Sequence, residues 1–226
     1  MINIEDITNR IINGDCMDIL KELPDKCVDL ILTDPPYGIG YDKLCSKMSN
    51  TYQGNGVAMR GNYRKTDWDN KTPDKEIFDE ILRVSKNQII FGGNYIANML
   101  PNSKCWLVWN KLNGTNNWAD CELAWTSFNS PVKKYDFLWN GMLQQDMKNK
   151  EQRIHPTQKP VDLIGQILRD YSKEGDLILD CFSGSGTTAI ACHRFNRRFV
   201  CIEKDKEYFE ASVKRLEDER KQLNLF

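Results

Sequence analysis

The 226-residue sequence predicts an α/β domain with a largely parallel β-sheet of about seven strands. Two observations support this prediction: short apolar segments recur between turn-forming residues, and amphipathic helical patterns separate several of them. The apolar segments are mostly continuous rather than alternating, which is typical of strands covered on both faces. The expected strands are residues 11–13, 28–33, 88–91, 105–109, 122–126, 177–181 and 199–202.

Three segments carry the helical spacing of apolar residues. The first follows Pro73, a residue type that often begins a helix, the second follows Pro160, and the third lies near the C-terminus. Their apolar faces consist of Ile77, Phe78, Ile81 and Leu82, of Leu163, Ile164, Ile167 and Leu168, and of Phe209, Val213 and Leu216. Helices placed between strands in this way allow neighbouring strands to run parallel.

The composition is that of a globular protein, with 40% hydrophobic and 28% charged residues. No apolar run reaches the roughly 18 residues of a membrane span, so we expect no membrane association. The eight cysteines are scattered without a C-x-x-C pair, which favours a reducing, cytoplasmic compartment and argues against structural zinc. His155 and His193 are the only histidines, and neither has a partner at metal spacing, so no metal site is expected.

Basic residues gather in two parts of an otherwise acidic chain. The net charge is −1, yet residues 41–71 and residues 101–160 each carry three more basic than acidic side chains. These local excesses of positive charge fit a phosphate-binding face, although solvated loops with some lysine explain them equally well. Residues 38–70 and 128–153 also interrupt the alternation of strands and helices. We expect a single domain over residues 1–226 that contains both irregular segments.

The strand expected over residues 28–33 ends in an unusual turn, Asp34-Pro35-Pro36-Tyr37. The two prolines stiffen the backbone and remove two amide donors beside a carboxylate and an aromatic ring. A simple change of chain direction does not need this combination. Taken alone, the four residues are still better explained as an ordinary proline turn.

The strand expected over residues 177–181 leads into a glycine turn of the kind that binds nucleoside cofactors. Gly184-Ser185-Gly186 lets the backbone approach a ligand, and a helix expected from about Thr187 presents free amides there. Glu203 ends the next strand, where its carboxylate can accept hydrogen bonds from two ribose hydroxyls. The glycine pattern also fits a dinucleotide-binding dehydrogenase, whereas the lack of a following lysine excludes a P-loop.

Three motifs together resemble the S-adenosylmethionine-dependent amino-methyltransferases of DNA. They are D-P-P-Y at 34–37, H-P-T-Q-K-P at 155–160 and F-S-G-S-G-T-T at 182–188, and their order is similar to that of the beta class. The resemblance spans nearly the whole chain. It implies a doubly wound, seven-stranded, Rossmann-like methyltransferase sheet with a reversed last strand.

The residue types of the D-P-P-Y turn suit the chemistry that the resemblance implies. An exocyclic amine is a poor nucleophile because its lone pair is delocalised into the ring. Hydrogen bonds from the amine to the Asp34 carboxylate and the Pro35 carbonyl would localise the lone pair, and Pro36 would help to keep these acceptors rigid. Tyr37 would stack on the target base, which must leave the duplex because its amino group is otherwise paired.

The resemblance also implies a cofactor site. The motif N-G-D-C-M-D-I-L at 13–20 is similar to the segment of the family that contacts the cofactor adenine. Thr157 and Lys159 would lie near the start of a helix that faces the methionine carboxylate. The residues expected to surround S-adenosylmethionine are Asp15, Cys16, Thr157, Lys159, Asp180, Phe182, Gly184, Ser185, Gly186, Thr187 and Glu203.

The two irregular segments are the candidates for contact with double-stranded DNA. Residues 38–70 would form a flexible DNA-facing loop, and residues 128–153 a short target-recognition segment. Because these enzymes usually carry a larger recognition segment, target recognition here is expected to be short, relaxed or shared between the two. The basic residues assigned to DNA are Arg60, Arg64, Lys65, Lys133, Lys134 and Arg153.

The sequence therefore predicts a DNA methyltransferase that modifies adenine at N6. Asp at the first position of the turn is commoner among the family's adenine enzymes and Ser among its N4-cytosine enzymes, so N4-cytosine stays an alternative. A nicotinamide-dependent oxidoreductase and a catalytically silent DNA-binding accessory are two further hypotheses. The expected setting is a prokaryotic or phage-infected cell, and both a homodimer and an accompanying restriction enzyme are left open.

Overall fold

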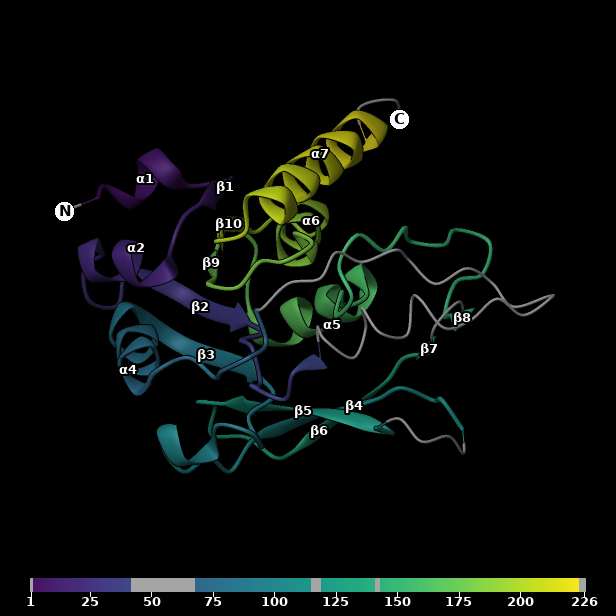
Figure 1. Ribbon diagram of the computed structural model, residues 1–226, viewed down its shortest axis with the longest axis horizontal. Coiled ribbons are helices and arrows are strands. Elements are labelled where there is room, and N and C mark those ends of the chain that lie inside the picture. The colour runs from purple at the N-terminus through teal and green to yellow at the C-terminus, as the bar shows by residue number, and fades with distance from the viewer. Residues whose placement is uncertain (1, 42–67, 115–118, 141–142, 224–226) are drawn as a thin grey trace.

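The computed structural model describes residues 2–41, 68–114, 119–140 and 143–223, and its centre is an eight-stranded sheet (Figure 1). The strand order is β1-β10-β9-β2-β3-β5-β4-β6. These strands are β1 Arg10–Asn13, β2 Val28–Thr33, β3 Ser85–Phe91, β4 Trp106–Asn110, β5 Cys121–Thr126, β6 Lys133–Asp136, β9 Leu177–Asp180 and β10 Arg198–Glu203. A separate two-stranded ribbon consists of β7 Trp139–Asn140 and β8 Leu143–Gln144.

The sheet is mostly parallel, as expected, and its reversed strand is β5. Strands β1, β10, β9, β2 and β3 pair in parallel, whereas β5 runs antiparallel to both of its neighbours, β3 and β4. Trp106 lies opposite Trp125 in the β4–β5 pair, and Asn110 lies opposite Cys121. The resemblance implied a reversed last strand, but the last strand of the chain, β10, is parallel to both of its neighbours, and the reversed strand is β5, inside the sheet between β3 and β4.

All seven expected strands are present, and β6 is an eighth that the sequence analysis missed. It pairs in parallel with β4 at one end of the sheet. Of its four residues, Tyr135 is buried and the other three are exposed. The strand therefore lacks the apolar run that identifies the others, and part of the segment 128–153 belongs to the sheet rather than to a loop.

Helices cover both faces of the sheet, which makes the fold doubly wound (Figure 1). The helices are α1 Ile4–Ile7, α2 Cys16–Glu22, α4 Lys75–Val84, a 3₁₀ turn at Ala97–Met99, α5 Val161–Tyr171, α6 Thr187–Arg194 and α7 Lys206–Leu223. The helix α6 contacts both α5 and α7, and α2 contacts α4. None of the helices in the described ranges combines the length and apolarity of a membrane-spanning segment.

Alternate residues of the central strands fill two cores, one on each face of the sheet. In β10, Phe199 and Cys201 point into the core that includes α5 and α6, while Val200 and Ile202 point into the core that includes α2 and α4. All four side chains are buried. Burial on both faces explains why the strands appear in the sequence as continuous apolar runs.

The boundary between the neighbouring strands β9 and β2 is the point at which the strand order of the sheet reverses. From β9 it passes through α6 to β10, and from β2 it passes through α4 to β3, so the strand order reverses between these parallel neighbours. Ligands of open α/β sheets bind at such a boundary, beyond the carboxyl ends of the strands. Asp34 follows β2 at this boundary, and Cys181 follows β9.

Candidate active site

A cavity of about 750 Å³ opens at the carboxyl ends of β2, β9 and β10. Its volume lies in the range of small-ligand pockets. The expected site residues that line it are Asp15, Cys16, Asp34, Pro36, Thr157, Lys159, Asp180, Phe182, Gly184, Ser185, Thr187 and Glu203. Pro35, Tyr37 and Gly186 lie outside this lining. The fold thus brings the D-P-P-Y turn, the H-P-T-Q-K-P segment and the glycine loop to one cavity.

Glu203, at the end of β10, holds the glycine loop through backbone amides. Its Oε2 atom accepts a hydrogen bond from Gly184 N at 2.7 Å, and its Oε1 atom accepts one from Asp205 N at 2.8 Å. Gly186, which precedes α6, has a φ of +73°, in the left-handed region that favours glycine. Burial raises the pKa of Glu203 to about 7, so its charge changes near neutral pH.

Asp180, at the end of β9, ties this strand to β2 from a buried position. Its Oδ1 atom accepts hydrogen bonds from Thr33 Oγ1 at 2.8 Å and from Phe182 N at 3.1 Å. Its Oδ2 atom accepts a hydrogen bond from Thr188 Oγ1 at 2.6 Å. Burial raises the pKa of the Asp180 carboxyl. Asp180 lines the cavity, and its contacts within the protein fix the two strand ends and the start of the glycine loop.

Both carboxylate oxygens of Asp34 are engaged in this structure. The Tyr37 hydroxyl donates a hydrogen bond to Asp34 Oδ1 at 2.6 Å, and the Lys159 ammonium donates one to Oδ2. Burial raises the pKa of Asp34, while the positive charge of Lys159 opposes that rise. The turn therefore presents a carboxylate whose two acceptor oxygens are already paired within the protein.

Asp69 holds the backbone of the turn, and the sequence analysis did not single it out. Its Oδ1 atom accepts hydrogen bonds from Tyr37 N and Gly38 N, both at 2.8 Å. Its Oδ2 atom accepts a hydrogen bond from Tyr41 N, also at 2.8 Å. Asp69 is 1% exposed. No pattern in the sequence reveals this role, because Asp69 lies in an irregular segment and has no motif that distinguishes it from Asp67 nearby.

The ring of Tyr37 packs into a space that Gly92 leaves open. A Cβ atom on Gly92 would lie 2.0 Å from Cε1 of Tyr37, and Gly92 has a φ of +68°. The Tyr37 ring also stacks on Tyr95, with centroids 4.8 Å apart and an interplanar angle of 15°. Gly92 gives the chain a tight exit from β3, and it also makes room for the Tyr37 ring.

His155, the first residue of the H-P-T-Q-K-P segment, packs between two aromatic rings. Its ring centroid lies 5.2 Å from that of Trp68 and 4.3 Å from that of Tyr208. The Thr157 hydroxyl lies 3.0 Å from His155 Nδ1. Burial lowers the pKa of His155 to about 3, so the imidazole is neutral at physiological pH. Across the described ranges, no group of three or more His, Cys, Asp or Glu side chains is arranged to hold a metal ion.

Lys159 ends between two carboxylates. Its side chain is 7% exposed and lines the cavity, and its ammonium contacts Asp34 and Glu122. The ammonium also lies 4.5 Å from the centroid of the Phe91 ring. The contact of Lys159 with the methionine carboxylate stays a prediction, whereas the structure pairs its ammonium with the D-P-P-Y turn. Glu122, on the reversed strand β5, was missed because strand residues were assigned to the core.

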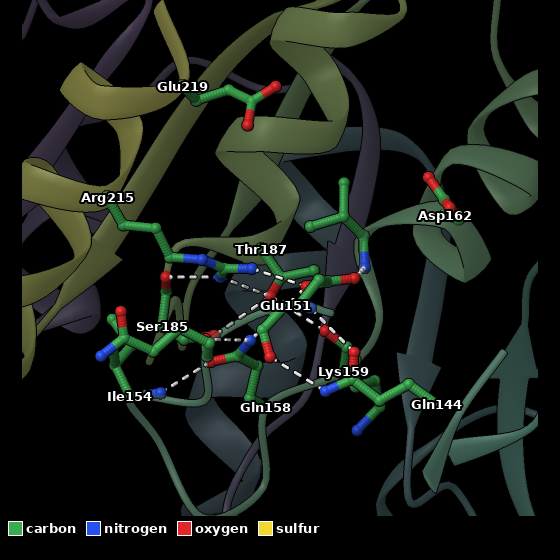
Figure 2. Close-up of polar contacts among 12 residues, drawn as sticks. Gln144, Glu151, Ile154, Gln158, Lys159, Asp162, Ser185, Thr187, Arg215 and Glu219 are labelled. Atoms are coloured by element: carbon green, nitrogen blue, oxygen red, sulfur yellow. Dashed lines mark hydrogen bonds and ion pairs between the residues drawn. The ribbon is translucent and has the colours of Figure 1, made fainter. Parts of the chain in front are cut away.

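A polar network around Glu151 fixes the H-P-T-Q-K-P segment against the glycine loop (Figure 2). Glu151 accepts hydrogen bonds from Val161 N at 2.8 Å and from Arg215 Nη2 at 2.7 Å. Arg215, on α7, also donates to Ser185 O at 3.0 Å and to Thr187 Oγ1 at 3.1 Å. Three segments that are far apart in the sequence are therefore joined beside the cavity. The sequence offered no signal for this pairing.

Asp15 and Cys16 lie where β1 leads into α2. The Asp15 Oδ1 atom caps α2 by accepting a hydrogen bond from Met17 N at 2.9 Å, and its Oδ2 atom pairs with Lys204 Nζ at 2.8 Å. The hydrogen bond from Lys204 is the main reason that the pKa of Asp15 is lowered. Burial raises the pKa of Cys16 to about 12, so its thiol stays protonated. Both residues line the cavity, and their contact with the cofactor adenine stays a prediction.

Three of the basic residues assigned to DNA lie in the described part of the chain. Lys133 and Lys134, on β6, form ion pairs with acidic neighbours at 2.8 and 3.0 Å. The guanidinium of Arg153 lies 4.4 Å from the centroid of the Trp139 ring. Arg60, Arg64 and Lys65 lie outside the described residues. Contact of these side chains with DNA stays a prediction.

The sequence matches known DNA methyltransferases along most of its length. Residues 124–214 match the family model N6_N4_Mtase, described as DNA methylase. The Type II methyltransferase M.HinfI of Haemophilus influenzae is 26% identical over 96% of this chain and 70% of its own length. The Type II methyltransferase M2.MboI of Moraxella bovis is 28% identical over 93% of this chain and 88% of its own length.

Solved structures share the fold. The M1.HpyAVI–SAM complex aligns with a TM-score of 0.55 and 24% identity, and the alignment covers 92% of this chain and 99% of that chain. The cytosine-N4-specific PvuII DNA methyltransferase aligns with a TM-score of 0.60 and 16% identity, covering 91% and 85% of the two chains. At these identities the similarity concerns the α/β fold.

The chain has the Rossmann-like α/β fold of the DNA methyltransferases with which it aligns. The match of residues 124–214 to the DNA methylase model and the similarity to two Type II methyltransferases support a DNA amino-methyltransferase of the N6-adenine or N4-cytosine kind. The M1.HpyAVI structure, which shares this fold, contains S-adenosylmethionine, and the motifs of this chain predict the same cofactor. The matches lend no support to a nicotinamide-dependent oxidoreductase.

Proposed function

We propose that this DNA amino-methyltransferase modifies N6 of adenine in double-stranded DNA. The observation that supports the proposal is that Asp34 of the D-P-P-Y turn and Glu203 beside the glycine loop line the same cavity. Asp34 stands at the first position of the turn, where the adenine enzymes of the family more often carry Asp and the N4-cytosine enzymes more often carry Ser. The preference for adenine rests on that residue.

The residues of the cavity fit the cofactor. Glu203 offers its carboxylate to the ribose hydroxyls, and Asp15 and Cys16 line the part of the cavity assigned to the adenine. Gly184 carries no side chain beside the His155 ring, so the backbone of the loop can approach a ligand closely. When bound, S-adenosylmethionine supplies an electrophilic methyl group on a sulfonium.

The D-P-P-Y turn supplies the acceptors for the amine. The target amine donates hydrogen bonds to the Asp34 carboxylate and the Pro35 carbonyl, which localises its lone pair. S-adenosylmethionine would supply the methyl group and leave as a neutral thioether, and Asp34 would stabilise the positive charge that develops on the amine nitrogen. One proton then passes from that nitrogen to the Asp34 carboxylate. Pro36 keeps the backbone rigid, so the acceptors do not have to reorganise.

Binding of the target base requires a change at Asp34. Both of its oxygens are engaged in the present structure, one by Tyr37 and one by Lys159. The base must also leave the duplex, at a free-energy cost of a few kcal/mol. Stacking on Tyr37 would offset part of that cost. We assign the remaining DNA contacts to residues 38–70 and 128–153.

The test is transfer of labelled methyl from S-adenosylmethionine to duplex DNA, with the nucleosides resolved by mass spectrometry. We expect label in N6-methyladenine with the wild-type protein. The variant Asp34→Ala should lose at least about 100-fold in rate, because a positioned proton acceptor contributes roughly that factor. Calorimetry should show that the variant still binds the cofactor.

Other outcomes of this test discriminate between the hypotheses. Label in N4-methylcytosine would retain the mechanism and replace adenine by cytosine as the target. Absence of label from any DNA, with the cofactor bound, would identify a silent DNA-binding accessory or an enzyme with another acceptor. Full activity of Asp34→Ala would reject the turn as the catalytic element.

A further inference from the structure

Glu122 completes a row of alternating charges that reaches the catalytic turn. Its Oε1 atom lies 2.6 Å from Lys111 Nζ, and its Oε2 atom lies 3.2 Å from Lys159 Nζ. Lys159 pairs in turn with Asp34 Oδ2. We refer to Lys111, Glu122, Lys159 and Asp34 as the charge row. It contains two cations and two carboxylates, so its net charge is zero when all four groups are ionised.

The side chains of the charge row are largely removed from solvent. Lys159 is 7% exposed, Lys111 is 20% exposed, and the two carboxylates are each 23% exposed. Removing one partner from such a row leaves a neighbouring charge uncompensated in a poorly solvated place, which is strongly unfavourable. The ammonium of Lys159 therefore needs an anionic partner at every stage of the reaction, including the stage at which Asp34 accepts the amine.

We propose that Glu122 is a positioning residue for methyl transfer: it takes over the Lys159 ammonium when the target amine arrives at Asp34. The inference rests on the proposed role of Asp34. Because Lys159 Nζ already lies 3.2 Å from Glu122, the ammonium can shift its hydrogen bond without leaving its buried position. Asp34 Oδ2 is then free to accept a hydrogen bond from the amine, and Asp34 remains ionised beside a positive charge.

The neighbours of Asp34 in the charge row shift its pKa in opposite directions. The groups that face its carboxyl are Tyr37 of the turn, Lys159, Glu122 of β5 and Asp180 of β9. Burial raises the pKa of Asp34, Lys159 lowers it, and Glu122 raises it. Neutral replacements of Lys159 and Glu122 must therefore move the ionisation of Asp34 in opposite directions, which loss of packing alone would not do.

The experiment compares pH profiles of kcat/KM for duplex DNA at saturating S-adenosylmethionine. In Glu122→Gln, Lys159 stays on Asp34, so the acidic limb should move to lower pH by about one unit and kcat should fall about tenfold. In Lys159→Met, the acidic limb should move to higher pH by about one unit. The double variant should bring the limb back towards the wild-type position, and Lys159→Arg should leave it in place.

Measurements of cofactor affinity and of stability distinguish a positioning role of Glu122 from loss of cofactor binding and from loss of folding. Glu122→Gln should bind S-adenosylmethionine with an unchanged Kd, and its thermal unfolding should confirm that it is folded. Lys173→Met is the matched control. Lys173 is exposed and precedes β9, so it lies near the amino ends of the strands, away from the cavity at their carboxyl ends. Limbs that move in the same direction, or do not move, would overturn the inference. So would loss of cofactor binding in Lys159→Met with an unmoved limb.

A second measurement does not depend on DNA. Carbon-13 NMR of the labelled Asp34 carboxyl, in the protein without substrate, reports its titration directly. Opposite shifts in the Glu122→Gln and Lys159→Met variants would support the charge row even if the wild-type protein failed to methylate DNA, an outcome that would reject the proposed function alone. Absence of these shifts in an active enzyme would reject the charge row alone.

Discussion

Glu203 carries its negative charge where burial opposes it. Burial raises the pKa of this carboxyl to about 7, although amide hydrogen bonds from Asp205 and Gly184 favour the ionised form. An unperturbed glutamate has a pKa of about 4.3. Because the folded-state pKa is the higher one, ionisation of Glu203 lowers the free energy of unfolding as pH rises from about 4 to 7, and the loss is complete above that range.

The same titration should control cofactor affinity. We expect S-adenosylmethionine to bind more weakly as pH falls below about 7, because the ribose hydroxyls need a carboxylate acceptor. One unit below its pKa the group is about one-tenth ionised, so the calorimetric Kd should rise up to about tenfold between pH 8 and pH 6. Glu203→Gln should bind weakly at both values. If the Kd of Glu203→Gln depended on pH as the wild-type Kd does, the titration would belong to another group.

Gly92 is a single position on which the geometry of Tyr37 depends. An alanine there would place Cβ 2.0 Å from the Tyr37 ring, so the ring must move and its hydrogen bond to Asp34 must change. We expect Gly92→Ala to lower kcat at least about tenfold while cofactor affinity is kept. Methyl-transfer assays and calorimetry measure the two quantities.

Gly175→Ala is the matched control for backbone strain. Gly175 also has a positive φ, of +82°, but a Cβ atom there meets nothing within 4 Å. Both substitutions should cost about 1 kcal/mol in backbone strain, and Gly175→Ala should leave kcat unchanged. Equal losses of kcat in the two variants would show that strain, rather than displacement of Tyr37, explains the effect.

At the scale of elements, α7 does more than cover the sheet. Its Arg215 side chain, 16% exposed, connects Glu151 to the loop that begins α6. The Ser185 carbonyl, the Thr187 hydroxyl and the start of α5 are thereby held by one guanidinium and one carboxylate (Figure 2). The geometry of the cofactor loop therefore depends on a helix that does not itself carry a sequence motif.

Removing the guanidinium should loosen this connection. We expect Arg215→Met to lower the free energy of unfolding by about 2 kcal/mol, less than for a fully buried pair because both partners keep some exposure. Urea denaturation measures the change, and a weaker cofactor Kd should accompany it. Arg220→Met, on the same helix, removes an exposed hydrogen bond to Asn9 O and should change stability by less than about 0.5 kcal/mol. Equal effects would argue against a special role of Arg215.

At the scale of the whole molecule, the strands were predictable where both of their faces are buried. The seven apolar runs correspond to seven strands of the sheet, and four of them, β2, β3, β9 and β10, are largely buried on both faces, which leaves a continuous apolar pattern. The strand β6 was missed, since Tyr135 is its one buried residue. Its formation depends on pairing with β4, which no local pattern encodes.

Some residues in and around the cavity were predictable from the sequence, and others were not. Residues in motifs, such as Asp34, Glu203 and Gly184, were found because their chemistry and spacing are readable along the chain. Asp69 and Glu122 were not found, because each acts through a partner that is distant in the sequence. Positions of this kind become visible when the fold brings strand ends and loops together.

The placement of Asp69 has a consequence for how this enzyme can change over evolutionary time. Its carboxylate receives the amides of Tyr37, Gly38 and Tyr41 on one side of residues 42–67, while Asp69 itself stands on the other side. Tyr41 and Asp69, which flank residues 42–67, are thus held together next to the D-P-P-Y turn. Insertions, deletions or exchange of residues 42–67 are therefore expected to leave the backbone of Tyr37 and Gly38 in place, because Asp69 holds these two amides from the far end of the segment.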